Sequence, residues 1–204
     1  MALVTPAEAK IHIPELVGTL EDANLTTLIG RVGGAFARWC GYPPGSGPTT
    51  GLIPTMESAA YVRYLDGPGG RELALDIQPV VSVASIYDDS DWTWGADTLV
   101  AAGDYAISDA ERGLVLLTAT STHGSWSVAR RAIKATYTAG FATVPADLKW
   151  AAILAVRAVW TGRREQGKTN LSSDGLSVGL VDEAMLPATA REILAPFRLG
   201  RSLL

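Results

Sequence analysis

The chain has 204 residues, 48% of them hydrophobic, and a formal net charge of −4. This length and composition suffice for one good-sized domain, or for a helical domain carrying a β insertion, and they exclude a chain that is disordered as a whole. A protein that grips nucleic acid by its phosphates is normally basic, so the acidic balance argues against tight DNA binding. Cys40 is the only cysteine, which excludes an intramolecular disulfide and a cysteine-based metal site, and we expect its thiol to be buried.

The N-terminal sequence, Met-Ala-Leu-Val-Thr-Pro, lacks the basic segment and the apolar stretch of a signal peptide. No apolar run reaches the roughly 18 residues that span a membrane. We therefore expect a protein that is made in a cytoplasm and has no membrane partner.

Two helical patterns open the chain. Residues 5–8 (Thr-Pro-Ala-Glu) have the residue types and spacing of a capping box, which predicts a short helix that Pro14 interrupts. A longer helix is predicted over 21–39, where apolar residues recur every three or four positions. Residues 43–57, rich in Pro, Gly, Ser and Thr, are typical of an irregular linker.

Between residues 58 and 138 the hydrophobic pattern becomes alternating, which indicates strands. Residues 61–65 and 71–75 flank the glycine-rich segment 66–70 (Asp-Gly-Pro-Gly-Gly), and we expect them to form a hairpin. Other short strands are predicted over 80–87, 104–107, 113–117 and 132–138, with 104–107 paired to 113–117. Short strands joined by turns are typical of a small antiparallel sheet or sandwich.

The most apolar helix is predicted over 145–163, where Lys149 and Arg157 alone interrupt the apolar surface. A helix that is apolar nearly all round is buried on all sides. In a chain of this size, the pattern indicates a contact between subunits as well as a core. The residues that we expect at this interface are Trp150, Ile153, Leu154, Arg157 and Trp160.

The C-terminal part of the chain has three segments. Residues 164–182 are polar and glycine-rich, which favours a flexible loop. A last short helix is predicted over 187–195, and Pro196 ends it. The tail that follows, to residue 204, is basic and apolar and has no core of its own.

These patterns predict an α+β chain. N- and C-terminal helices, in residues 1–57 and 139–204, form a helical bundle, and residues 58–138 form an inserted small antiparallel β domain.

The segment from Gly162 to Thr169 fits the phosphate-loop pattern G-x-x-x-x-G-K-[ST]. Such a loop binds phosphate because a buried strand delivers it and a helix N-terminus follows it. Here the match follows a predicted helix, and the Asn-Leu-Ser-Ser after it does not begin a stable one. We interpret it as a chance match and keep nucleotide binding as a minor alternative.

Other candidate chemistry is weak. The run Asp88-Asp89-Ser90-Asp91 lacks the alternating ligands, central Gly and distal Glu of a calcium loop, so we expect a solvated turn at the end of a strand. The histidines, His12 and His123, have no nucleophile or carboxylate beside them in sequence. The sequence therefore predicts no catalytic residue, no cofactor, no metal and no enzyme activity.

Tryptophans offer a possible contact surface. Trp92 and Trp94 lie in a polar stretch, and Trp126 lies near Arg130 and Arg131. Aromatic rings beside cations can stack on nucleic-acid bases, but Trp is also enriched where protein surfaces meet. We favour packing at a sheet edge or a subunit contact.

Several short segments, in their order along the chain, carry a resemblance to a known family. They are 3–10 (LVTPAEAK), 64–73 (YLDGPGGREL), 79–83 (PVVSV), 137–148 (YTAGFATVPADL), 186–187 (LP) and 196–198 (PFR). Together they resemble the head-tail connector (adaptor) family of long-tailed bacteriophages and gene transfer agents. The resemblance covers nearly the whole chain, and the loop between Cys40 and Tyr61 departs from it in length.

The resemblance implies a structural virion protein at the neck, the head-tail interface, made in the cytoplasm of a bacterial host. It implies a homo-oligomeric ring, expected to be a dodecamer, that binds the portal protein, extends the DNA channel and docks a stopper or tail-terminator protein. DNA would pass through without tight binding, which the acidic balance suits. The residues that would dock on the portal, by their position in the chain, are Phe197, Arg198, Leu199, Arg201, Leu203 and Leu204.

A tail-completion or neck protein of another layer is the alternative structural function. Proteins of both kinds form rings, so the residue patterns do not separate them.

Overall fold

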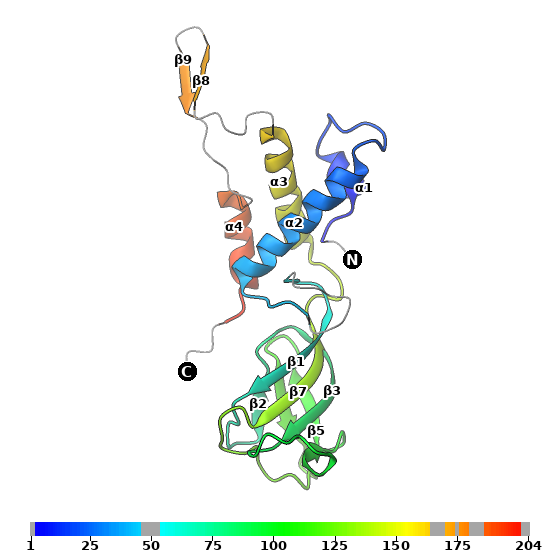
Figure 1. The fold of residues 1–204 in the computed structure, drawn as a ribbon, viewed down its shortest axis with the longest axis vertical. Coiled ribbons are helices and arrows are strands. Elements are labelled where there is room, and N and C mark those ends of the chain that lie inside the picture. Colours follow the sequence, from blue (N-terminus) through cyan, green and yellow to red (C-terminus); the bar gives the residue numbers. More distant parts are fainter. Residues whose placement is uncertain (1–2, 46–53, 164–169, 174–175, 180–185, 201–204) are drawn as a thin grey trace. The chain divides into compact units, whose positions relative to one another are not determined.

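The computed structural model describes residues 3–45, 54–163, 170–173, 176–179 and 186–200. They form two compact units, one from Met1–Cys40 and Val144–Arg198 and the other chiefly from Gly41–Thr143. The first contains helices and is called the helical unit here; the second contains the two larger sheets and is called the β unit (Figure 1). The expected α+β class is confirmed.

The main elements of the helical unit follow the sequence pattern closely. They are α1 (Pro6–Ile11), α2 (Asp22–Cys40), α3 (Ala146–Gly162), α4 (Ala188–Leu194) and the 3-10 turn η2 (Ala195–Phe197). The predicted capping box begins α1: the Thr5 hydroxyl accepts a hydrogen bond from the Glu8 N–H at 3.2 Å, and the Glu8 carboxylate accepts one from the Thr5 N–H at 2.8 Å.

The core of the helical unit lies where α2, α3 and α4 pack together, with α1 against α2 and α3. Its fully buried side chains include Leu25, Ile29, Val32, Phe36, Leu148, Val156 and Leu194. The Cys40 thiol is part of this core, and its sulfur lies 3.9 Å from the carbonyl oxygen of Leu194. Burial raises the pKa of Cys40 to about 12, which confirms the expected inert, buried thiol.

The β unit contains two antiparallel sheets. The 4-stranded sheet has the order β1 (Ala59–Leu65), β7 (Ile133–Ala139), β3 (Val80–Asp88) and β4 (Leu99–Val100), and the 3-10 turn η1 (Ala96–Thr98) precedes β4. The 3-stranded sheet has the order β2 (Glu72–Ala74), β6 (Leu114–Leu117) and β5 (Tyr105–Asp109). The predicted pairing of 104–107 with 113–117 is confirmed by β5 and β6.

The hairpin expected around residues 66–70 is wrong. The strand before it, β1, pairs with β7, and the strand after it, β2, pairs with β6. The glycines serve another purpose: the Gly67 N–H donates to the Ala129 carbonyl at 2.8 Å, and a Cβ on Gly67 would lie only 2.0 Å from the Ser127 carbonyl oxygen. They let the two chain segments approach closely instead of closing a tight turn.

Alternation along β7 fills the core of the β unit. Ile133, Ala135, Tyr137 and Ala139 are all buried, and the residues between them are half-buried. Other large buried side chains of this unit are Tyr61, Leu73, Ile86, Val115, Leu117 and Trp126. Gly140 follows β7 with φ +103°, and a Cβ there would lie 2.5 Å from the Glu57 carbonyl oxygen, so this turn requires glycine.

The two predicted loops have different outcomes where they are described. Within 164–182, β8 (Asn170–Ser173) and β9 (Leu176–Gly179) pair as antiparallel strands, so a loop without secondary structure is wrong for these residues. The sequence between them is Asp-Gly, which is favoured in two-residue hairpin turns and was the missed signal. In the 43–57 linker, Pro44 and Pro54 form an isolated β-bridge.

Candidate assembly surfaces

The predicted interface residues on α3 divide into an inner and an outer set. Ile153 and Trp160 are buried inside the helical unit, with exposed fractions of 8% and 5%. Arg157 is exposed, Leu154 is half-buried, and Trp150 is 44% exposed. The helix therefore offers Trp150, Leu154 and Arg157 to a partner, while Ile153 and Trp160 already have partners in their own subunit.

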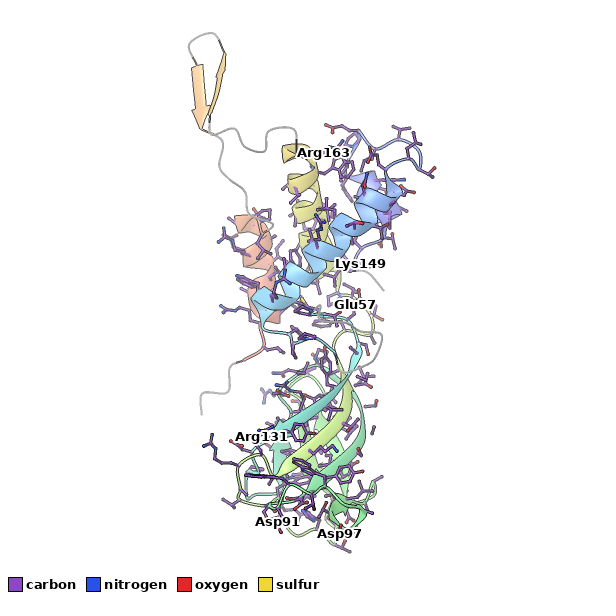
Figure 2. The ribbon with its side chains drawn as sticks, viewed as in Figure 1. Glu57, Asp91, Asp97, Arg131, Lys149 and Arg163 are labelled. Atoms are coloured by element: carbon purple, nitrogen blue, oxygen red, sulfur yellow. The ribbon has the colours of Figure 1, made fainter. Side chains whose placement is uncertain are left out.

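Both tryptophans of α3 contact a second side chain. The Trp150 ring meets the His12 ring edge-on at 5.2 Å between centroids. The guanidinium of Arg163, at the end of α3, lies 3.8 Å from the centre of the Trp160 ring (Figure 2). The buried indole N–H of Trp160 has no acceptor in the described part of the chain.

A charged clamp fixes α1 against the first turn of α3. The Lys149 ammonium lies 2.9 Å from the Glu8 carboxylate, which also caps α1 (Figure 2). The hydrogen bond from the Thr5 N–H, followed by the bond from Lys149, lowers the pKa of Glu8 to about 2. The carboxylate is thus charged through the whole neutral and mildly acidic range.

The C-terminal residues that we expect to dock on the portal are described only in part. Phe197 ends η2 and is half-buried, as is Leu199. Arg198 is exposed, and its guanidinium lies 4.9 Å from the centre of the Trp39 ring on α2. Arg201, Leu203 and Leu204 lie outside the described residues.

The phosphate-loop match has its elements in the wrong order. Its first residue, Gly162, is the last residue of α3, and strand β8 begins at Asn170. Residues 164–169 lie outside the described residues. A phosphate loop needs a strand before it and a helix after it, so that backbone N–H groups of the helix face the phosphate.

The acidic run at the end of β3 is not a solvated turn, which corrects the expectation for Asp88 and Asp89. Their exposed fractions are 9% and 7%. One carboxylate oxygen of Asp88 lies 2.7 Å from Nε2 of His123 and accepts the Ser127 N–H at 2.9 Å. Folding thus gives His123 the carboxylate partner that it lacks in sequence, and the pair ties the segment 123–127 to β3.

The Asp89 carboxylate shapes the loop after β3. It accepts hydrogen bonds from the N–H groups of Asp91, Thr93 and Trp94, at 2.7 to 2.9 Å, and from the Thr93 hydroxyl at 2.7 Å. The Thr93 hydroxyl is the largest cause of a lowered pKa of Asp89. These bonds hold Trp94 in a left-handed conformation, with φ 47°.

Aromatic and cationic side chains gather around this loop. The Trp94 and Tyr64 rings lie 4.8 Å apart, with Arg131 over Tyr64 and Lys134 over Trp94. Trp92 is 56% exposed, which agrees with a contact at the edge of the fold.

Trp126, which the sequence groups with Trp92 and Trp94, is a core residue. It is 1% exposed, and its indole N–H donates to the Arg71 carbonyl at 3.1 Å.

A polar network inside the β unit was missed from sequence. The Arg63 guanidinium pairs with Asp76 through Nε at 2.7 Å, and the Tyr137 hydroxyl donates to the same carboxylate at 2.7 Å. Burial, followed by the charge of Asp76, raises the pKa of Tyr137. The three residues are 13 and 61 positions apart, so no local pattern reveals them.

No group of metal-binding side chains occurs among the described residues. Within the same residues, none of the helices has both the length and the apolar character to cross a bilayer. The described helical unit offers Trp150, Leu154 and Arg157 of α3 as a surface on which another protein can pack, a feature typical of structural, assembling proteins.

Comparisons with known proteins identify the family. Residues 6–199 match the family model described as head completion protein, HCP. A chain in the structure titled "Virion of native gene transfer agent (GTA) particle" has the same fold: the TM-score is 0.54 and the identity 19%, over 98% of this chain and 94% of that one. No curated protein matches the sequence.

The chain belongs to the head completion protein family, since the match covers nearly its full length. It is therefore a structural component of the virion, at the neck of the particle, and the expected family relationship is confirmed.

Proposed function

We propose that the chain is an adaptor subunit whose copies form a ring between the portal and the tail. In this function it extends the DNA channel and docks a stopper or tail-terminator protein. It acts by assembly and catalyses no reaction. The helices of residues 1–57 and 139–204 would form the body of the ring, and residues 58–138 would form an insertion in it.

The outer set on α3 carries the proposal. Trp150, a large apolar ring, remains 44% exposed, and Leu154 and Arg157 accompany it on the same helix. Tryptophan and arginine are enriched at the energetic centres of protein interfaces.

The C-terminal segment would dock on the portal. Phe197 and Arg198 end the helical unit, and the sequence continues with Leu199, Arg201, Leu203 and Leu204. A segment that combines apolar and basic side chains suits insertion between partner surfaces. The net charge of −4 suits a channel that lets DNA slide, because fixed cations would hold the phosphates.

The test is a mixture of the purified chain with the portal of the same particle, measured by light scattering. Wild type should form a complex with the mass of a portal carrying a ring. Removal of residues 196–204 should abolish portal binding and leave the circular-dichroism spectrum unchanged. Binding that survives the deletion contradicts the docking segment, and a wild type that never binds contradicts the adaptor function.

A further inference from the structure

The segment between α1 and α2 carries the most exposed apolar side chains of the helical unit. Ile11 is 75% exposed, Val17 88% and Leu20 96%. Residues 11–20 are called the apolar loop here. Side chains of this size gathered in one short segment indicate a contact surface more than chance exposure.

The apolar loop has a defined conformation. The Lys10 ammonium binds the Gly18 carbonyl at 2.5 Å and pairs with the Asp22 carboxylate at the start of α2. Gly18 has φ +81°, a conformation that other residues rarely adopt. The loop is thus fixed in a shape that leaves Val17 and Leu20 in solvent, and a prearranged surface loses little conformational entropy when it binds.

The exposed charges beside the apolar loop are acidic. Glu15 and Glu21 are exposed, and neither forms an ion pair with any described residue. The two cations nearby are already in use, Lys10 by Asp22 and Lys149 by Glu8. The loop therefore presents apolar groups together with negative charge.

The opposite side of the helical unit carries the complementary charge. In Figure 1, α1 and the apolar loop lie on one side of α2 and α3, and α4 lies on the other. Arg191 on α4 and Arg38 in the last turn of α2 are exposed and form no ion pair among the described residues. Glu192, beside Arg191, is exposed as well, so these three charges sum to +1. Ala195 and Pro196, also exposed, supply small apolar groups. The two arginines with Ala195 and Pro196 are called the basic flank here.

We propose that the apolar loop of one copy packs against the basic flank of the next copy, head to tail. This inference rests on the ring of the proposed function and names the surfaces that would close it. A contact between two identical loops would set Glu15 and Glu21 against themselves, whereas loop against flank pairs opposite charges. Contacts between two different surfaces of one chain generate rings when the rotation closes.

The test counts the copies bound to each portal by native mass measurement of the mixed complex. Leu20→Ser should weaken copy-to-copy binding by about tenfold or more, because a central apolar group is lost. Val128→Ser is the matched control: Val128 is 85% exposed but lies in the β unit, and its variant should assemble as wild type does.

Charge reversal gives a second readout that a folding defect cannot imitate. The variant with Glu15→Lys and Glu21→Lys, and the variant with Arg38→Glu and Arg191→Glu, should each assemble poorly. A chain with all four changes should recover assembly, because the pairs are attractive again. Single copies of each variant should still bind the portal through the C-terminal segment.

The outcomes separate the contact from the ring. The loop-to-flank contact would be overturned if Leu20→Ser and both charge-reversal variants still formed full rings. It would also be overturned if the chain with all four charge changes assembled no better than the two-change variants. Either result would leave the proposed ring unaffected. A wild type that binds no portal would overturn the adaptor function, and the contact with it.

Discussion

The two units of this chain differ in how they use their polar and aromatic groups. In the β unit, Asp76 and Asp88 are bound by partners from distant strands and loops, and Trp126 is completely enclosed. In the helical unit, large apolar groups such as Trp150 and Leu20 remain exposed on fixed elements. Exposed apolar groups also occur in the β unit, where Trp92 is 56% and Val128 85% exposed, so what distinguishes the β unit is its buried polar network and not a closed surface.

In a structural virion protein, function depends on the surfaces that its partners contact. Buried polar networks fix one structure and are satisfied within it. Exposed apolar groups on fixed elements mark the places where assembly continues. The comparison is tested by changes in each unit that should affect either stability or assembly but not both.

The largest effect is expected for Trp126→Ala in the β unit. Removal of a large, fully enclosed side chain and of its hydrogen bond to the Arg71 carbonyl should lower the free energy of unfolding by about 3–5 kcal/mol. Urea unfolding followed by tryptophan fluorescence and circular dichroism measures it. A loss below about 1 kcal/mol would contradict the enclosed position.

A smaller decrease in the free energy of unfolding is expected for Asp88→Ala. The change leaves the His123 ring and the Ser127 N–H without their acceptor, which should cost about 1–3 kcal/mol. The exposed Asp97 provides the control, and Asp97→Ala should change stability by about 0.5 kcal/mol at most. Equal effects of the two changes would show that Asp88 is not a structural anchor.

The Glu8 clamp predicts a specific acid dependence. The pKa of Glu8 is about 2 in the folded chain against an ordinary 4.5, so its stabilising effect is complete above pH 4.5 and is lost as the pH falls toward 2. Glu8→Gln should flatten the fall in stability over this range. Thermal unfolding of wild type and variant across it measures the difference, and parallel curves would contradict the clamp.

The smallest effect on stability is expected for Trp150→Ala, although the residue is as large as Trp126. Because the side chain is 44% exposed, its loss should lower the free energy of unfolding by only about 1 kcal/mol. Ring assembly on the portal should nevertheless weaken. If Trp150→Ala is unstable, or if it is stable and assembles normally, the assignment of Trp150 to the interface is contradicted.

Local patterns predicted the helices well because their determinants are local. The capping box at Thr5 and Glu8 and the apolar repeat of α2 and α3 lie within a few turns of chain. Strand positions were also found, but the pairing of β1 was not, since its partner β7 is far away in sequence. A glycine-rich segment between two strands favours a hairpin. Here the glycines instead allow residues 127–129 to pack closely against Gly67.

The sequence also could not predict which residues of α3 are exposed. Exposure of Trp150 and burial of Trp160 cannot be read from a helix whose pattern is apolar nearly all round, because the pattern does not say which face meets α2 and α4. The apolar loop was missed because Pro14 and Gly18 interrupt the helical period there. Its importance depends on exposure, which only the folded chain reveals.

The most direct test of the adaptor function is an electron cryomicroscopy image of the assembled particle at the neck. Copies of this chain should form one closed ring directly below the portal, with the helical units in contact from copy to copy. A density that places the chain in another layer, or as separate copies without mutual contact, would contradict it.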